Sequence, residues 1–61
     1  MRTICVLIED TIHNGNIIDS VYMSFPCFIK EKIVDNNYKE ITITARREDI
    51  PSIEKRLSAI V

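Results

Sequence analysis

Apolar and polar residues alternate on both sides of the dipeptide Asn14-Gly15. Asn-Gly favours the positive φ angles of a two-residue type I′ turn, so it predicts a tight hairpin that joins residues 3–12 to residues 16–25. A turn at this place gives the two strands one shared apolar face, which a slip of one residue would scatter. The expected pairs are Ile12 with Ile17, Ile8 with Val21, Val6 with Met23 and Ile4 with Phe25.

The same alternation returns in residues 27–34 and 38–45. Between them lies Asp35-Asn36-Asn37, and these residue types are typical of loops because they tolerate left-handed backbone geometry. We therefore expect a second hairpin, closed by this three-residue loop. In its register Ile29 pairs with Ile43, Lys32 pairs with Glu40, and Glu31 lies beside Ile41 on the apolar face.

The hydrophobic period changes near the C-terminus, where apolar residues recur at helical spacings. These residues are Ile50, Ile53, Leu57, Ile60 and Val61. Asp49 suits the N-cap of an amphipathic helix and Pro51 suits its first turn. A helix of about twelve residues is marginal alone, so we expect it to dock on the sheet. The predicted fold is α+β, a single small domain over residues 1–61: a four-stranded antiparallel β-meander of two hairpins with one C-terminal helix packed on one face.

Composition and charge narrow the expected location and partners. With 46% apolar and 28% charged residues, the chain has the composition of an ordered globular protein. Its net charge of −1 creates no field that would draw it to nucleic acid or to an anionic membrane. No apolar stretch approaches the ~20 residues that a membrane span needs, so we expect no membrane partner. Nothing resembles a secretion signal, so we expect a cytoplasmic protein with free thiols.

Few residues of the sequence suggest a catalytic, metal-binding or phosphate-binding role. A single glycine leaves no phosphate-binding Gly-rich loop, and Cys5 and Cys27 lack the spacing of metal ligands. His13 is the only histidine and precedes the expected turn, where water is hard to exclude. Asp10 and Asp19 fall opposite each other in the first hairpin, and their oxygens suit a divalent cation, but two carboxylates make a weak site. We expect no catalytic residues, no metal and no cofactor, and therefore no enzyme. A small enzyme or metal-dependent protein built on Asp10 and Asp19 is the third and least favoured interpretation.

The sheet face away from the helix carries an apolar patch in this prediction. Leu7, Tyr22, Phe28 and Tyr38 form it, and such side chains are common in protein interfaces. A second subunit would also support the thin core of a 61-residue chain. We therefore predict a small non-catalytic protein-interaction module, a homodimer or a ligand of a larger host protein, that regulates or inhibits a larger macromolecule. Short chains of this kind are common in phages and mobile elements.

The alternative is a nucleic-acid-binding transcriptional regulator. Arg46 and Arg47 follow the last expected strand and could contact phosphates. Residues 39–45, followed by the helical stripe, resemble the opening of ribbon-helix-helix regulators, in which a strand reads the DNA groove as part of a dimer. Glu48 and Asp49 lie beside the arginines and offset their charge, so nucleic acid is the less favoured partner.

Overall fold

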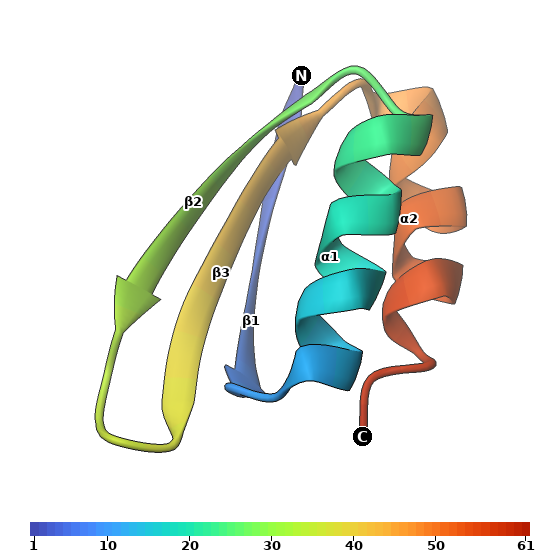
Figure 1. Cartoon of the computed structure of the whole chain (residues 1–61). Coiled ribbons are helices and arrows are strands. Elements are labelled where there is room, and N and C mark those ends of the chain that lie inside the picture. Colours follow the sequence, from blue (N-terminus) through green and yellow to red (C-terminus); the bar gives the residue numbers. More distant parts are fainter.

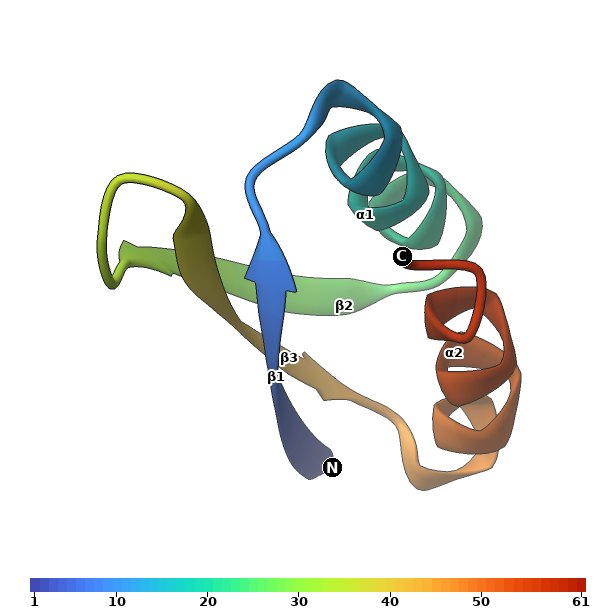
Figure 2. The same cartoon turned by 90° about the horizontal axis from the view of Figure 1, so that it is seen from below.

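Three strands form one antiparallel sheet, and two helices lie together on one side of it (Figures 1 and 2). The computed structural model describes all 61 residues. Strand order is β1-β3-β2, so β3 is central and both edge strands run antiparallel to it. The elements are β1 (Arg2–Glu9), α1 (Ile12–Ser24), β2 (Cys27–Ile33), β3 (Tyr38–Ala45), a 3₁₀ turn η1 (Arg47–Asp49) and α2 (Ile50–Leu57).

The predicted N-terminal hairpin is wrong, because residues 12–24 are helix α1. The dipeptide Asn14-Gly15 lies inside its first turns, and no residue of the chain has a positive φ. The Thr11 side chain caps the helix by accepting a hydrogen bond from the backbone N–H of Asn14 at 3.1 Å. The fold therefore has three strands and two helices rather than four strands and one helix, and the α+β class is confirmed.

The spacing of the apolar residues explains why Asn14-Gly15 does not form a turn. The buried positions of α1 are Asn14, Ile18 and Val21, which recur after four and three residues on one helix face. As a helix the segment buries these side chains against the sheet. Strand β1 meanwhile pairs with β3, where Ile4 lies opposite Ile43 and Val6 opposite Ile41. These pairs replace the partners expected in residues 16–25.

The predictions for the second hairpin are confirmed. Strands β2 and β3 pair in the expected register, with Ile29 opposite Ile43 and Lys32 opposite Glu40. The loop is held by the Asp35 carboxylate, which accepts hydrogen bonds from the backbone N–H groups of Asn37 at 2.8 Å and Tyr38 at 3.0 Å.

The predicted C-terminal helix is also present, although it ends at Leu57 and does not continue to Val61. Pro51 lies in its first turn, as expected. Asp49 stands at the N-cap position but makes no side-chain cap, because its carboxylate accepts a hydrogen bond from Arg46 Nε at 3.0 Å.

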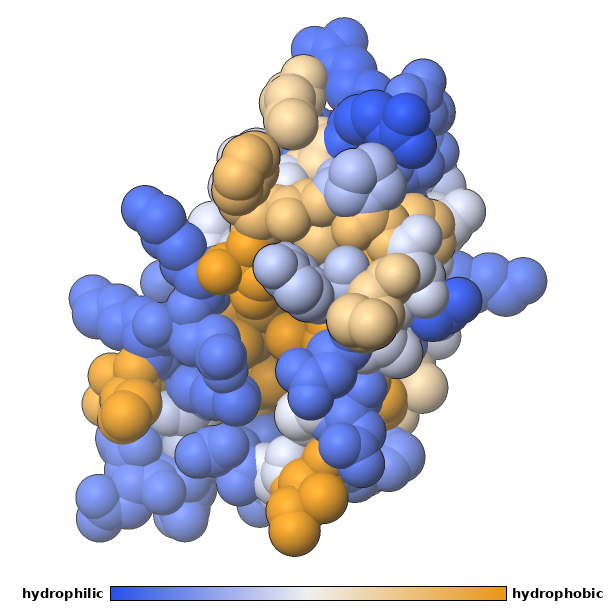
Figure 3. All heavy atoms as spheres, turned by 45° about the horizontal axis from the view of Figure 1, so that its top comes forward, coloured by the Kyte–Doolittle hydropathy of each residue, from blue (hydrophilic) through white to orange (hydrophobic).

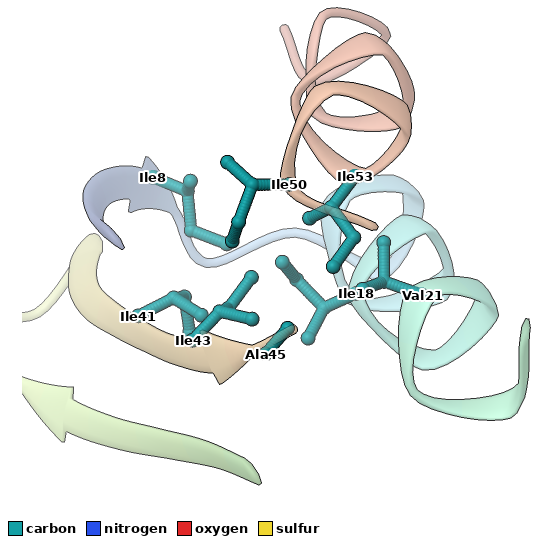
Figure 4. Close-up of a cluster of buried hydrophobic side chains, with 8 residues drawn as sticks. All are labelled: Ile8, Ile18, Val21, Ile41, Ile43, Ala45, Ile50 and Ile53. Carbon is teal, nitrogen blue, oxygen red and sulfur yellow. The ribbon is translucent and has the colours of Figure 1, made fainter. Parts of the chain in front are cut away.

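Eight apolar residues form the buried core between the sheet and the two helices (Figure 4). Four come from the strands and two from each helix: Ile8, Ile41, Ile43 and Ala45; Ile18 and Val21; Ile50 and Ile53. Ile4, Val6, Cys27 and Ile29, on the same face of the sheet, are only half-buried against this cluster. The core is therefore thin, as expected for the chain length.

Asn14 is the one buried polar residue, and it joins three parts of the chain. Its Nδ2 donates to the carbonyl of Glu9 at 2.9 Å and to the carbonyl of Val61 at 3.2 Å. Its Oδ1 accepts from the N–H of Val61 at 3.3 Å. These bonds fasten the start of α1 to the end of β1 and to the last residue.

Substitutions at the Asn14-Gly15 dipeptide distinguish a helix from a turn. Gly15→Ala should raise the free energy of unfolding by roughly 0.5–1 kcal/mol, because alanine favours helix and the added Cβ meets no atom within 4 Å. Asn14→Ala should lower it by about 1–3 kcal/mol, since buried backbone groups lose their partner. Urea denaturation measures both changes. A type I′ turn would make Gly15→Ala destabilising, and that result would contradict helix α1.

Candidate functional site

The sheet has one covered face and one open face. Alternate residues of a strand point to opposite faces, and Ile41 and Ile43 of β3 point toward the helices. The open face is the opposite side, formed by positions 3, 5, 7 and 9 of β1, 28, 30 and 32 of β2, and 38, 40, 42 and 44 of β3. Three large side chains lie exposed there: Leu7 is 61% exposed, Phe28 70% and Tyr38 43%.

Threonines occupy the middle of the open face. Phe28 lies opposite Thr44, and Thr44 in turn lies opposite Thr3. The Thr3 and Thr44 hydroxyl oxygens are hydrogen-bonded at 2.9 Å. One row further along, the Thr42 hydroxyl donates to Cys5 Sγ at 3.9 Å. The three large apolar side chains therefore stand around a band of small hydroxyl groups and do not form one continuous apolar patch.

Tyr22 does not lie with the other three residues of the predicted patch. It belongs to α1, on the helix side of the sheet, where it is 61% exposed. Its neighbour Met23 and, at the start of the helix, Ile12 are exposed as well. The structure thus places Leu7, Phe28 and Tyr38 on one face of the sheet, with Phe28 near one end of β3 and Tyr38 at the other, and it places Tyr22 on a separate surface. The prediction grouped Tyr22 with the other three residues because it assigned residues 16–25 to a strand, whereas residues 12–24 form helix α1.

A shallow depression of about 430 Å³ lies between the end of α1 and the side of α2. The end of α1 is at the top of Figure 1, which Figure 3 brings forward, and apolar surface is exposed on this side among hydrophilic side chains. Phe25, Ser52, Lys55 and Arg56 line the depression. The Arg56 guanidinium lies 5.7 Å from the Phe25 ring centroid, and its Nη1 donates to Ser24 Oγ at 3.1 Å. These contacts hold α2 to the end of α1.

Sequence analysis missed this depression. Three of its residues belong to α2, and Phe25 follows the end of α1, a segment that was expected to be a strand. The helical spacing of Ile18, Val21 and Phe25 was the signal that could have placed them.

Lys39 lies at the centre of a charged cluster on the inner face of the sheet. Its Nζ is 2.6 Å from Glu31 Oε1 and 3.4 Å from Asp10 Oδ1, and only 16% of its side chain is exposed. This contact explains why Glu31 is tolerated beside Ile41. The hydrogen bond from Lys39 to Glu31 is the main reason that the Lys39 pKa is raised, with Asp10 adding to the effect and burial opposing it.

The predicted pairing of the two aspartates does not occur. Asp10 follows β1 and pairs with Lys39, whereas Asp19 is an exposed residue of α1. The hairpin that would have placed them face to face is absent. His13, also expected at that turn, lies in the first turn of α1, where its Nε2 is 3.2 Å from the carbonyl oxygen of Ala59.

The arginines of the predicted nucleic-acid site lie just after β3. Arg46 Nε is 3.0 Å from Asp49 Oδ2 and 3.5 Å from Glu48 Oε1, so its charge is locally offset. Arg47 is exposed at the start of η1. Strand β3 is the central strand of a three-stranded sheet, whereas the DNA major groove accommodates a two-stranded ribbon.

No family model, curated protein or solved structure matches this chain. Neither helix is long and apolar enough to cross a membrane.

The Lys39 cluster predicts a loss of stability at alkaline pH. A lysine whose pKa is raised in the folded state stabilises the fold below its ordinary value of 10.5, and this contribution disappears as the pH rises through the folded value. Urea denaturation between pH 8 and pH 11.5, roughly, should show the loss. Lys39→Met should flatten this part of the profile. An equally steep decline in the variant would contradict the assignment to Lys39.

The two thiols should differ in reactivity. Cys5 is exposed, whereas Cys27 is half-buried and its pKa is raised, first by burial and then by the negative charge of Asp49. Because the thiolate is the nucleophile, iodoacetamide at neutral pH should alkylate Cys5 faster. Mass spectrometry of Cys5→Ser and Cys27→Ser separates the two rates. Faster reaction at Cys27 would contradict its placement.

Proposed function

We propose that this protein is a non-catalytic protein-interaction module that binds a larger protein through the open face of its sheet and thereby regulates or inhibits it. The supporting observation is the exposure of Leu7, Phe28 and Tyr38 on a sheet face that no helix covers. Exposed aromatic and aliphatic side chains set among polar ones are typical of protein interfaces.

The chemistry of the open face suits a protein partner. Phe28 and Tyr38 offer large apolar area at a small cost in side-chain entropy, and tyrosine adds a polar tip. The threonine band between them supplies hydroxyl groups that can donate and accept hydrogen bonds. Charged residues of both signs, Lys30, Lys32 and Glu40, lie in the same face and supply the polar surroundings typical of interfaces.

Binding without catalysis agrees with the size and shape of this face. The open face is a sheet surface of side chains in alternate rows, which can cover part of a larger partner. Occlusion of a partner's functional surface is the simplest way for so small a chain to act, and we propose regulation or inhibition on that ground.

The alternative of nucleic-acid binding gains less support. Arg46 is engaged by Asp49 and Glu48, and phosphate binding would have to compete with both carboxylates. The likeness to ribbon-helix-helix regulators requires a strand that is free to enter a groove, whereas β3 is the central strand. A gel shift that weakens in a combined Arg46→Ala and Arg47→Ala variant would revive this alternative.

The proposal predicts that binding depends on Phe28 and not on Tyr22. Both are exposed aromatic residues, so Phe28→Ser and Tyr22→Ser form a matched pair on opposite sides of the sheet. The immobilised protein should retain a partner from host lysate, and Phe28→Ser should weaken binding of the purified partner by at least ~10-fold in calorimetry, as expected for an aromatic anchor. Tyr22→Ser should change it little.

Equal binding by both variants, or binding lost only in Tyr22→Ser, would contradict the open face as the binding surface. Circular dichroism of each variant verifies that the fold is retained.

A further inference from the structure

The outer edge of β1 carries unpaired backbone groups. The N–H of Asp10 donates to the carbonyl of Asn37 at 2.7 Å, which continues the register of β1 with β3. In an antiparallel pair, residues alternate between facing the neighbour and facing away. The even-numbered residues of β1 therefore bond to β3, and Thr3, Cys5 and Leu7 point their N–H and C=O groups away from the sheet.

Strand β1 lacks the features that protect an edge. Its register with β3 runs without a bulge from Arg2 to Glu9, and residues 3–8 contain neither a charge nor a proline. Proteins usually block exposed edges with charged residues, prolines or bulges. The other edge strand, β2, follows Pro26 and carries the charged run Lys30-Glu31-Lys32. The free edge that can accept another strand is therefore that of β1.

We propose that a second copy of this chain pairs antiparallel with β1, so that the two sheets join into one of six strands. Cys5 lies on the two-fold axis, opposite the partner's Cys5. Thr3 then lies opposite the partner's Leu7, and each outward-facing residue of this stretch exchanges both of its backbone hydrogen bonds with the second copy. This inference goes beyond the proposed function, because it concerns the strand edge and not the open face.

The occupied carbonyl of Glu9 excludes registers shifted toward the C-terminal end of β1, and among the others the register centred on Cys5 forms the most backbone pairs within Arg2–Glu9. It already accepts from the N–H of Thr11 at 2.9 Å and from Asn14 Nδ2 at 2.9 Å. A shift that placed Cys5 opposite the partner's Leu7 would bring Glu9 opposite the partner's Thr3 and would need that carbonyl. With Cys5 at the centre, the pairs formed by Thr3, Cys5 and Leu7 use free groups only.

The strand is complementary to itself in charge and in shape. Arg2 stands at one end of β1 and Glu9 and Asp10 at the other, so antiparallel pairing brings strand ends of opposite charge near each other, with Arg2 directly opposite the partner's Ile8, whereas parallel pairing would bring ends of like charge near each other. On the helix side, Ile4 lies opposite the partner's Val6. Both residues are half-buried in one chain, and their pairing adds to a core of eight buried apolar residues. This symmetry is the reason to choose a second copy over a foreign strand.

Charge substitutions at Cys5 test the two-fold axis. The Cys5 side chain is exposed on the open face, so Cys5→Lys and Cys5→Glu should fold. The original chain should sediment as a dimer at micromolar concentration. Each variant alone should be monomeric, because like charges meet on the axis, and an equimolar mixture should recover the dimer.

A monomeric original chain up to millimolar concentration would overturn the proposal. A dimer that persists in both single variants would do the same, since no charge would then meet on an axis at Cys5.

Oxidation of the thiols tests the register independently. In the proposed pair the two Cys5 Cα atoms are about 5.5 Å apart, within the range of a disulfide. Diamide, which takes two electrons and two protons from the thiols, should link Cys27→Ser into a covalent dimer and should leave Cys5→Ser unlinked. Linkage through Cys27 alone would overturn the register. Phe28→Ser, at the far edge of the sheet, should leave the dimer intact, so failure of the dimer and failure of the open-face proposal are separate results.

Discussion

Strand β3 supports the rest of the molecule because it is hydrogen-bonded on both sides and covered on one face. Ile41, Ile43 and Ala45 are fully buried, and they contact side chains from both helices. Each edge of β3 pairs with a strand whose residues point alternately toward the helices and toward the open face. Because every other element packs on β3 or pairs with it, its register sets where each exposed side chain stands.

The arrangement of three strands and two helices explains both surfaces that we propose to bind partners. Two short helices can shield one side of a three-stranded sheet, so the other side stays bare and presents Leu7, Phe28 and Tyr38. The central position of β3 leaves β1 with one unpaired edge. The open face and the free edge thus follow from the same topology. They remain distinct because the face exposes side chains and the edge exposes backbone groups.

Local polar contacts fasten the ends of the elements to this frame. Asn14 links the start of α1 to the end of β1 and to Val61, and Arg56 links α2 to Ser24 at the end of α1. Lys39 does the same for β2 through Glu31. These bonds matter in a chain with eight buried apolar residues, because the burial of so little apolar surface leaves a narrow margin over the entropy of the unfolded chain.

The sequence by itself determined the second hairpin and the C-terminal helix, because in both cases the signals are local. The alternation of residues 38–45, the loop Asp35-Asn36-Asn37 and the helical stripe around Ile53 need no distant partner to be read. The Asn14-Gly15 dipeptide is the contrary case. Its turn preference of about 1 kcal/mol competes with helical burial of Ile18 and Val21, which is worth more.

Only the tertiary structure decided between a turn and a helix at Asn14-Gly15, since it supplied β3 as the partner of β1 and a core against which α1 could pack. The formation of a helix in place of a strand also determined on which surface each predicted site residue lies. Leu7, Phe28 and Tyr38 were placed on one face by strand alternation, which the sequence displays. Tyr22 lies on the other side because its segment is a helix, and β1 has a free edge because it pairs with β3 alone.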